Sequence, residues 1–482
     1  MPSTRTACSP SLESDENAVV SGSIPRHSRI VIVGAGPSGL SVGYFLRKHG
    51  YRNVTILERH QRVGGQCRTV TEHQRAFDLG ATFVSPDFHE VKRLAREVRA
   101  ELESFGGAQG MTFDAASKTI RLRDLMEHIV GSNSRIDYVR FLGQCGRYAW
   151  KRLGLRRLFR DSDWTAAVAG RGELKKSFAQ WLGDYHLAGL SRLFEIPLTA
   201  FGYGSLDEIP AAYGLRYMTV RAFLATVLTA MPISRFLPRS LVCGCFRQGY
   251  QRLWERLAWD LDVRLNVRID RVERRSDGIR ITYAHPAGLI DTEESTDETA
   301  DFDYLVLTCP LTARELREQI DFDADELRLL ERVRTVRYAV VSYEVEGLPK
   351  TERIVVHVPV PDRGLPMIML RLHPECASVA FAGRLADGEP RNVEEQEFRR
   401  AVEDCISALG GKIVSGESYY DVAPYFRHVG LDDLSDGLLP EWNRRQGENR
   451  TFYSGGLFDF DHVEGTIRAA RRLVERSFVR SR

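Results

Sequence analysis

The chain has few of the features that mark secreted, membrane-spanning or nucleic-acid-binding proteins. Its eight cysteines are scattered over 482 residues without a C-x-x-C pair, so we expect reduced buried thiols and no metal site. The net charge of +2 gives no reason to expect a nucleic-acid partner. The longest apolar run, residues 223–231, is too short to cross a bilayer. Residues 1–27 lack the apolar core of a signal peptide, so we expect a disordered tail and a cytoplasmic protein.

What the chain does have begins with a glycine-rich turn after an apolar run. Residues 30–33 read I-V-I-V, as in a buried parallel strand, and the next six read G-A-G-P-S-G. In such a turn Gly34 permits the tight bend, Gly36 lets the backbone approach a pyrophosphate, and Gly39 lets the following helix pack closely on the strand. Pro37 suits the first turn of that helix, whose free N–H groups face phosphates.

A second strand and an acid complete the pattern. Residues 53–57 form the strand, and Glu58 follows it, 19 residues after Gly39. A carboxylate at this place accepts both hydroxyls of an adenosine ribose, and the sequence around it disfavours the phosphorylated ribose of NADP. Since strand, glycines, helix, strand and acid stand in register, we predict a dinucleotide site, with FAD and NAD both open at this stage.

Two small-residue stretches that follow favour FAD. Residues 62–69 read R-V-G-G-Q-C-R-T, and residues 78–80 read D-L-G. They resemble the flavin amine oxidase superfamily, whose pattern is R-x-G-G-x-x-x-T followed by D-x-G, and simple NAD dehydrogenases lack both. The alternative is an ordinary glycine turn. The resemblance implies FAD as the cofactor, with further contacts from Arg59, Gly64, Gly65 and Gly80.

A long stretch, residues 196–217, reads I-P-L-T-A-F-G-Y-G-S-L-D-E-I-P-A-A-Y-G-L-R-Y. Its composition alone indicates a turn between helices that faces something apolar. Its sequence resembles that of the bacterial FAD-dependent polyunsaturated fatty acid isomerases, which carry P-x-T-A-F-G-Y-G and then D-x-(I/V)-P-A-A-Y-x-L-x-Y. The resemblance implies that Phe201 gates a substrate tunnel and that Tyr203 and Tyr213 contact the substrate. The isomerases place a carboxylate-holding arginine beside this phenylalanine, where residues 109–113 of this chain contain none.

The end of the chain resembles the same isomerases without gaps. The stretch R-T-F-Y-S-G-G ends at Gly456, where the isomerases have a glutamate, and a helix is expected from near Val463. The N-terminus of that helix stabilises negative charge on a reduced flavin ring. The resemblance implies cofactor contacts from Gly455, Val463 and the backbone near Val267, and a substrate contact from Phe458.

The chemistry that the resemblance implies needs no catalytic side chain. In the isomerase family the flavin N5 atom abstracts a hydride from a carbon between double bonds, and the hydride returns at another carbon. Such a reaction needs a dry apolar pocket that holds one C–H bond accurately. The single glycine fingerprint gives no second site for NAD(P)H.

Three hypotheses follow for the function. The two enzymatic ones have a lipophilic small molecule as the substrate, and none of the three requires an obligate protein partner. The first is redox-neutral double-bond isomerisation of a polyunsaturated fatty acid or related polyene. The second is an FAD-dependent dehydrogenase or oxidase that desaturates or oxidatively cyclises a secondary metabolite. The third is a flavin-binding protein with a structural role. The retained plan of a substrate domain favours the first two.

The order of predicted elements indicates an α/β protein, since 482 residues exceed one simple core. We expect a Rossmann-type FAD-binding domain with an interleaved α+β substrate domain of antiparallel sheet plus helices, as in amine oxidases. We assign to the FAD-binding domain residues 28–105, 247–312 and 413–482, and to the substrate domain residues 106–246 and 313–412. Periodicity predicts helices over residues 88–105, 120–150 and 394–409, and antiparallel strands over residues 338–347, 353–360, 366–373 and 378–385.

Two segments of the predicted substrate domain raise the question of a membrane. Residues 147–160 alternate basic residues with Trp150 and other apolar residues, which fits a membrane-surface helix or a solvated charged face. We favour the solvated face, because the polar sides of many helices look like this. Residues 228–242 form an apolar insertion relative to the isomerases, which we interpret as loop filling, with a substrate entrance or membrane contact as the alternative. A peripheral membrane contact therefore stays open.

Overall fold

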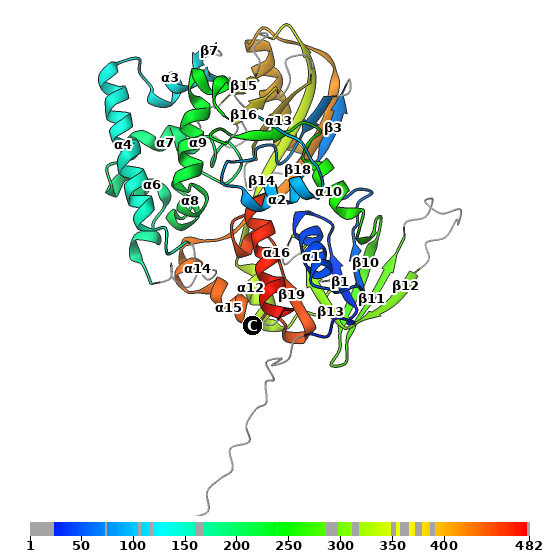
Figure 1. Ribbon diagram of the computed structural model, residues 1–482. Helices are drawn as coiled ribbons and strands as arrows, with labels where there is room; N and C mark the ends of the chain where they lie inside the picture. Colours follow the sequence, from blue (N-terminus) through cyan, green and yellow to red (C-terminus); the bar gives the residue numbers. More distant parts are fainter. Residues whose placement is uncertain are drawn as a thin grey trace, which may run out of the picture.

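The computed structural model shows two large sheets, three smaller sheets and a separate group of helices (Figure 1). It describes residues 24–72, 75–104, 108–114, 119–159, 168, 170–238, 240–285, 297–310, 318–348, 353–356, 366–371, 378–385 and 391–479.

The first sheet has five parallel strands in the order β19-β13-β1-β2-β9. Because all five run in the same direction, the carboxyl ends of β1, β2, β13 and β19 meet at one edge. Helices α1 and α16 lie side by side next to this sheet (Figure 1). The bounds are β1 Ile30–Val33, β2 Val54–Leu57, β9 Asp262–Arg264, β13 Tyr304–Leu307, β19 Thr451–Tyr453, α1 Pro37–Lys48 and α16 Val463–Ser477.

The second sheet has seven strands in the order β18-β14-β17-β16-β15-β6-β7, antiparallel except for the β15–β6 pair. Helix α13 packs Phe398 and Val402 against its core. The bounds are β6 Ala108–Asp114, β7 Thr119–Asp124, β14 Val333–Glu346, β15 Arg353–Val356, β16 Ile368–Leu370, β17 Ser378–Arg384, β18 Lys412–Val429 and α13 Arg391–Ala408. The two kinds of sheet confirm the predicted α/β class.

The second sheet takes up a segment that the sequence assigned elsewhere. The predicted boundary at residue 413 falls at the start of β18, and this strand is hydrogen-bonded along its length to β14. Residues 413–429 therefore extend the seven-stranded sheet. The predicted strands between residues 338 and 385 lie in the same sheet, with residues 357–360 and 372–373 outside the described part.

The helix predicted over residues 120–150 is wrong at its start. β7 takes the letters T-I-R-L-R-D into antiparallel pairing with β6, and the helices α3 (Leu125–Val130) and α4 (Arg135–Gly154) follow. The alternation of apolar and charged letters in β7 has the two-residue period of a strand, and the neighbouring strand selects it.

The helix predicted over residues 88–105 is shorter than expected. α2 spans His89–Glu97 and stops where Arg99 takes a φ of +55°, in the left-handed region. The chain then forms β5 (Leu102–Ser104), which pairs with β8 (Gly244–Phe246).

The remaining elements flank the two sheets. Helices α4, α6, α7, α8 and α9 form the helical part at the left of Figure 1, and the β10-β11-β12 sheet lies at the right. No described helix combines the length and the apolar composition needed to cross a membrane. The bounds are α6 Phe178–Asp184, α7 Ser191–Glu195, α8 Ala211–Tyr217, α9 Val220–Ala230, η3 Pro232–Phe236, α10 Tyr250–Ala258, β3 Thr69–Glu72, β4 Arg75–Asp78, β10 Arg268–Arg274, β11 Ile279–Ala284, β12 Asp297–Phe302, α12 Ala324–Glu331, α14 Leu431–Ser435 and α15 Leu438–Arg444.

Candidate functional site

The glycine turn between β1 and α1 has the conformation that its sequence predicts. Gly34 has a φ of +103°, in the region that favours glycine. A Cβ atom at Gly39 would lie 1.9 Å from the carbonyl oxygen of Gly34, so α1 packs too closely on the turn for any side chain. The fold itself requires these two glycines.

Gly36 and Gly455 differ from these two glycines because the space beside each of them is open. Among the described residues, a Cβ atom at Gly36 would meet only the Cα atom of Gly65, at 3.7 Å, and the φ of Gly36 is −76°. A Cβ atom at Gly455 would meet no described atom within 4 Å, although its φ of +153° disfavours a side chain. The protein thus leaves space open at the N-terminus of α1 and at the end of β19, as a bound dinucleotide requires.

Glu58 lies at the end of β2, only 6% exposed, with its carboxylate toward the turn. The N–H groups of Ala35 and His60 donate to its two oxygens at 2.7 and 2.9 Å. A carboxylate offers about four acceptor positions, so room remains for two ribose hydroxyls. Val267 donates its N–H to the carbonyl oxygen of Glu58 at 2.9 Å, which places it beside this acid. Arg59 is exposed, with its Nε atom 3.3 Å from Nε2 of His60.

The two amine-oxidase-like stretches meet each other in the structure. The Thr69 hydroxyl and the Tyr250 N–H both donate to Oδ1 of Asp78, at 2.5 and 2.9 Å. Burial raises the pKa of Asp78 to about 7. A Cβ atom at Gly80 would lie 1.8 Å from the carbonyl oxygen of Gln66, so packing alone explains this glycine.

Gly64 and Gly65 pass directly behind the glycine turn. The Gly64 N–H donates to the carbonyl oxygen of Ala35 at 2.9 Å, and a Cβ atom at Gly65 would lie 3.0 Å from the Cα atom of Gly36. Arg62, which sequence reasoning left unassigned, donates from Nη1 to the carbonyl oxygen of Gly65 at 2.8 Å. Burial lowers the pKa of Arg62. The signal for Arg62 was the first letter of the R-x-G-G pattern.

A cluster of aromatic rings, which we call the aromatic wall, packs against the segment that follows Gly455. Tyr203 is its centre and is 5% exposed. Two of the rings around it, those of Tyr217 and Phe460, stack on each other with an angle of 9° between the ring planes. The wall therefore joins the 196–217 stretch, β18 and the C-terminal segment. Centroid distances from the Tyr203 ring are 4.9 Å to Phe460, 5.0 Å to Phe426, 5.6 Å to Tyr217 and 5.7 Å to Tyr425.

The other three predicted substrate contacts lie around the wall. Phe201 is half-buried, and its ring centroid lies 5.2 Å from that of Phe83. Tyr213 lies behind the wall, where its hydroxyl accepts a backbone N–H of β18 at 3.3 Å. The ring of Phe458 lies 6.0 Å from that of Trp442. The structure thus brings Tyr203 into the wall and sets the other three around it.

A β-bulge in β18 explains how two consecutive residues reach Tyr203. The register with β14 shifts between Tyr425 and His428, so that two residues of β18 face one of β14. Phe426, inside the bulge, has a φ of +48°, which is rare for a bulky residue. Neighbouring side chains of a strand normally point to opposite faces, yet the rings of Tyr425 and Phe426 both contact Tyr203. Sequence reasoning missed both residues, although Pro424 directly before them is a residue that strands tolerate mainly at edges and bulges.

Tyr203 and Tyr425 of the wall and the two histidines beside it are neutral near pH 7. Burial raises the pKa of Tyr203 well above its ordinary value and that of Tyr425 to about 12. Burial lowers the pKa of His462, the N-cap residue of α16, to about 3, and that of His428 to about 4. None of these four groups is poised to exchange a proton with a substrate at neutral pH.

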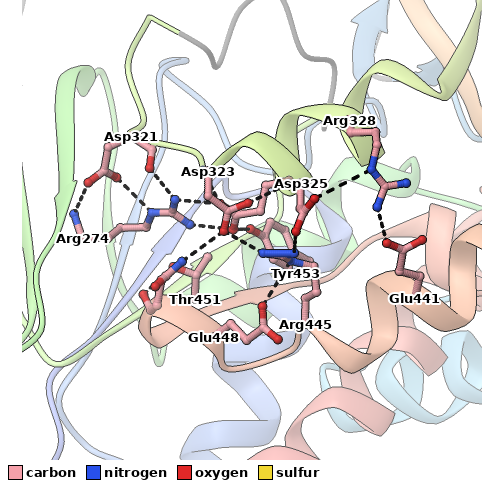
Figure 2. Close-up of polar contacts among 12 residues, drawn as sticks. Arg274, Asp321, Asp323, Asp325, Arg328, Glu441, Arg445, Glu448, Thr451 and Tyr453 are labelled. Atoms are coloured by element: carbon pink, nitrogen blue, oxygen red, sulfur yellow. Dashed lines mark hydrogen bonds and ion pairs between the residues drawn. The ribbon is translucent and has the colours of Figure 1, made fainter. Parts of the chain in front are cut away.

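A buried ion network fixes the end of β19 (Figure 2). Arg274 pairs with both oxygens of Glu326 at 2.7 Å, and the Tyr453 hydroxyl donates to the same carboxylate. Arg445 binds the N-cap residue of α12, with Nη2 2.7 Å from Oδ2 of Asp323. Tyr453 is the last residue of β19, so this network holds the backbone that leads into the open glycine.

A second ion cluster lies a few residues further along the chain. The fully buried carboxylate of Asp459 pairs with Arg216 of α8 at 2.7 Å and with Arg468 and Arg472 of α16 at 2.6 Å each. Burial alone raises the pKa of Asp459, but the three arginines hold it well below its ordinary value. The cluster ties α8, which carries Tyr217, to α16.

The structure also gives a reason for the missing glutamate at position 456. A Cβ atom at Gly456 would lie 2.1 Å from Oδ1 of Asp461. This aspartate pairs with Arg427 of β18 at 3.0 Å. Asp461 therefore occupies the space that a side chain at position 456 needs.

Comparison with known proteins gives one family. The model of the flavin containing amine oxidoreductases matches residues 37–370. The chain is 30% identical over 110 residues to the flavin-containing amine oxidase A of Bos taurus, covering 23% of this chain and 21% of that protein. It is 42% identical over 55 residues to the 4,4'-diapophytoene desaturase (4,4'-diapolycopene-forming) of a Methylomonas species, 11% of each protein. The chain thus spans about a fifth or less of the length of these relatives.

Solved structures resemble the chain along almost its whole length. The CLA-producing fatty acid isomerase from P. acnes superposes with a TM-score of 0.78 at 23% sequence identity. The superposition covers 95% of this chain and 100% of that chain. The likeness establishes the common fold.

Proposed function

Since this chain belongs to the family of flavin containing amine oxidoreductases and its cofactor is FAD, we propose that it shifts double bonds in a polyunsaturated fatty acid or related polyene. In the proposed reaction a hydride leaves an allylic carbon and returns to another carbon of the same molecule. One C–H bond breaks, another forms, and the double bonds move between them without net oxidation. Bound FAD supplies the acceptor and the donor of this hydride.

The observation that carries the proposal is the neutral aromatic wall beside the C-terminal glycines. Tyr203 and Tyr425 of the wall keep their protons, and His462 beside the wall stays neutral. These groups therefore do not favour proton abstraction from a substrate. The rings of Tyr203 and Tyr425 lie next to each other, with centroids 5.7 Å apart. The wall therefore offers an apolar surface that excludes water and positions a hydrocarbon chain.

The likeness to the CLA-producing fatty acid isomerase supports a fatty acid as the substrate class. The loop that resembles the isomerases carries both Phe201 and Tyr203, and the structure places the second of these at the centre of the wall. Residues 109–113, where the isomerases carry their arginine, form part of β6, and their side chains lie outside the described part of the structure. The substrate class thus rests on the loop and on the common fold.

The second candidate is dehydrogenation of a polyene. The match to the diapophytoene desaturase favours it, because that protein is named for forming additional double bonds in a long hydrocarbon. In this reaction a hydride and a proton leave adjacent carbons, and an external acceptor such as O2 takes the two electrons. The two candidates differ in whether the substrate is oxidised.

Incubation with linoleic acid deuterated at its central allylic carbon separates the candidates. Without oxygen, isomerisation gives a conjugated product of unchanged mass that retains the deuterium, and the flavin absorbance stays that of the oxidised form. Dehydrogenation bleaches the flavin once and then stops. A conjugated product that has lost the migrating deuterium to solvent, formed while the flavin stays oxidised, would contradict direct return of the hydride and with it the first candidate.

The control for this experiment is a protein without FAD. Gly36→Val places a side chain in the space left open at the N-terminus of α1, so the variant should lose the yellow chromophore and all turnover. If the variant keeps a full chromophore, the assignment of this space to the pyrophosphate is wrong.

A further inference from the structure

The large apolar side chains that the described part of the chain exposes are concentrated in one region. Nine of the eleven lie on α4, on α9 or in the segment after α9, and the other two are Trp259 and Val414. A soluble monomer rarely gathers large apolar residues on one face, and such faces mark interaction sites. The nine are Ile136, Val139, Leu142, Trp150, Leu153, Leu224, Ile233, Phe236 and Leu241.

On α4 the exposed apolar residues form a stripe that faces away from the protein. At about 100° per residue, the stripe falls within a sector of about 100°. The buried residues Phe141, Tyr148 and Arg152 fall on the opposite side of the helix. A Cβ atom at Gly143 or Gly146, inside the stripe, would meet no described atom within 4 Å. The stripe consists of Ile136, Val139, Trp150 and Leu153.

Basic residues border this stripe along one edge. Arg140, Arg147 and Lys151 are exposed and follow one another along α4. Between residues 132 and 159 the one acid is Asp137, which pairs with Arg140 at 2.9 Å. The face is therefore both apolar and positively charged, whereas the whole chain has a net charge of only +2.

The segment after α9 continues the same face beside the first half of α4. Tyr138 and Leu142 of α4 and Met231 at the end of α9 line one cavity of about 330 Å³ together with Met126 of α3. η3 begins directly after Met231 and exposes 54% of Ile233 and 76% of Phe236. Figure 1 shows α4 at the outer edge of the helical part, with α9 next to it.

We propose that this face is a docking surface for an anionic lipid bilayer. We call it the α4 face, made of Ile136, Val139, Leu142, Trp150, Leu153, Ile233 and Phe236 with Arg140, Arg147 and Lys151. When an amphipathic helix binds a membrane surface, its apolar stripe lies at the boundary between head groups and acyl chains. Arginine and lysine at the edge of the stripe then bind lipid phosphates. A tryptophan exposed at 77% suits the same boundary, since its ring is apolar and its N–H is polar.

Charge argues for lipid and against a second copy of the chain. In a two-fold symmetric dimer the α4 face would meet itself, and with antiparallel α4 helices its row of arginine and lysine would meet the same row. With a single paired acid on the helix, such a contact has no opposite charge to compensate it. An anionic membrane supplies that charge over the whole face. The proposal takes the membrane-surface interpretation of residues 147–160, since a solvated charged face does not account for the exposed stripe.

The test is flotation of the FAD-loaded protein with lipid vesicles, and it does not depend on turnover. The wild type should float with vesicles of phosphatidylcholine and phosphatidylglycerol in equal parts, and much less with phosphatidylcholine alone. Trp150→Ala should weaken binding about tenfold. Arg147→Gln should weaken it about fivefold, and added salt should reduce this difference. Trp259→Ala is the matched control, since Trp259 is 74% exposed away from this face.

Three results would overturn the proposal. The first is a wild type that does not float with the anionic vesicles at low salt. The second is equal binding by Trp150→Ala and Trp259→Ala, with flavin absorbance showing that both variants are folded. The third is a dimer in sedimentation equilibrium that Trp150→Ala converts to a monomer, because the face would then belong to a second copy of the chain.

Discussion

The nucleotide end of the site is made of backbone, whereas the substrate end is made of side chains. At the nucleotide end, glycines and N–H groups within one short stretch leave a space and direct donors into it. At the substrate end, rings from three distant segments touch, and buried ion pairs hold those segments in place. The first end depends on local geometry, and the second depends on packing between distant parts of the chain. Substitutions at the nucleotide end and at the substrate end should therefore have different consequences for stability and for cofactor binding.

The largest effect should come from the ion cluster at the substrate end. Asp459→Asn removes the fully buried anion shared by three partly buried arginines and should lower the free energy of unfolding by about 3–5 kcal/mol. Denaturant unfolding of the FAD-loaded protein measures this change. Asp137→Asn, at an exposed pair, is the control and should cost less than about 1 kcal/mol. Similar losses in the two variants would mean that the cluster does not hold the wall.

At the nucleotide end, two glycines three residues apart should separate stability from cofactor binding. Gly39→Ala places a Cβ atom against the backbone of Gly34 and should cost about 3 kcal/mol of stability. Gly36→Ala finds room in the protein, so it should cost less than about 1 kcal/mol yet weaken FAD binding about tenfold. Thermal unfolding and flavin absorbance per protein measure the two effects. The distinction fails if both variants lose stability and FAD together.

Between the two ends, Asp78 should make stability depend on pH. Its pKa is about 7 in the folded protein against an ordinary value of 3.8, so the folded state keeps a proton that the unfolded state has lost between these values. Stability should therefore fall as the pH rises from about 4 to about 7, and Asp78→Asn should remove on the order of 4 kcal/mol of this fall. Denaturant unfolding of both proteins across this range is the measurement. Parallel pH profiles would show that Asp78 ionises normally.

The smallest effect should come from Phe201, at the rim of the wall. Phe201→Ala should change KM between substrates of different chain length several-fold, because it alters an apolar contact worth about 1 kcal/mol. FAD content should stay unchanged, since the ring lies next to Phe83 and outside the nucleotide end. Steady-state kinetics on fatty acids of increasing length measures the effect. Identical selectivity would remove Phe201 from the substrate path.

The sequence predicts the nucleotide end well because its information is local. The strand, the turn and the acid at Glu58 lie within about thirty residues, and each glycine has its own physical reason. Of the residues that form the aromatic wall, the sequence names only Tyr203 as a substrate contact. Tyr425 and Phe426 lie more than two hundred residues further on and reach the site through a bulge set by pairing with β14. Sheet pairing also decides that β7 is a strand, which periodicity alone read as helix.

The bulge in β18 makes the substrate end sensitive to chain length as well as to residue type. Removing the one extra residue would restore regular alternation along the strand. Either Tyr425 or Phe426 would then turn away from Tyr203, although no other residue of the wall had been changed. Related proteins can therefore acquire a different substrate surface through a single deletion or insertion here, an event that a comparison of residue types position by position would register only as a gap.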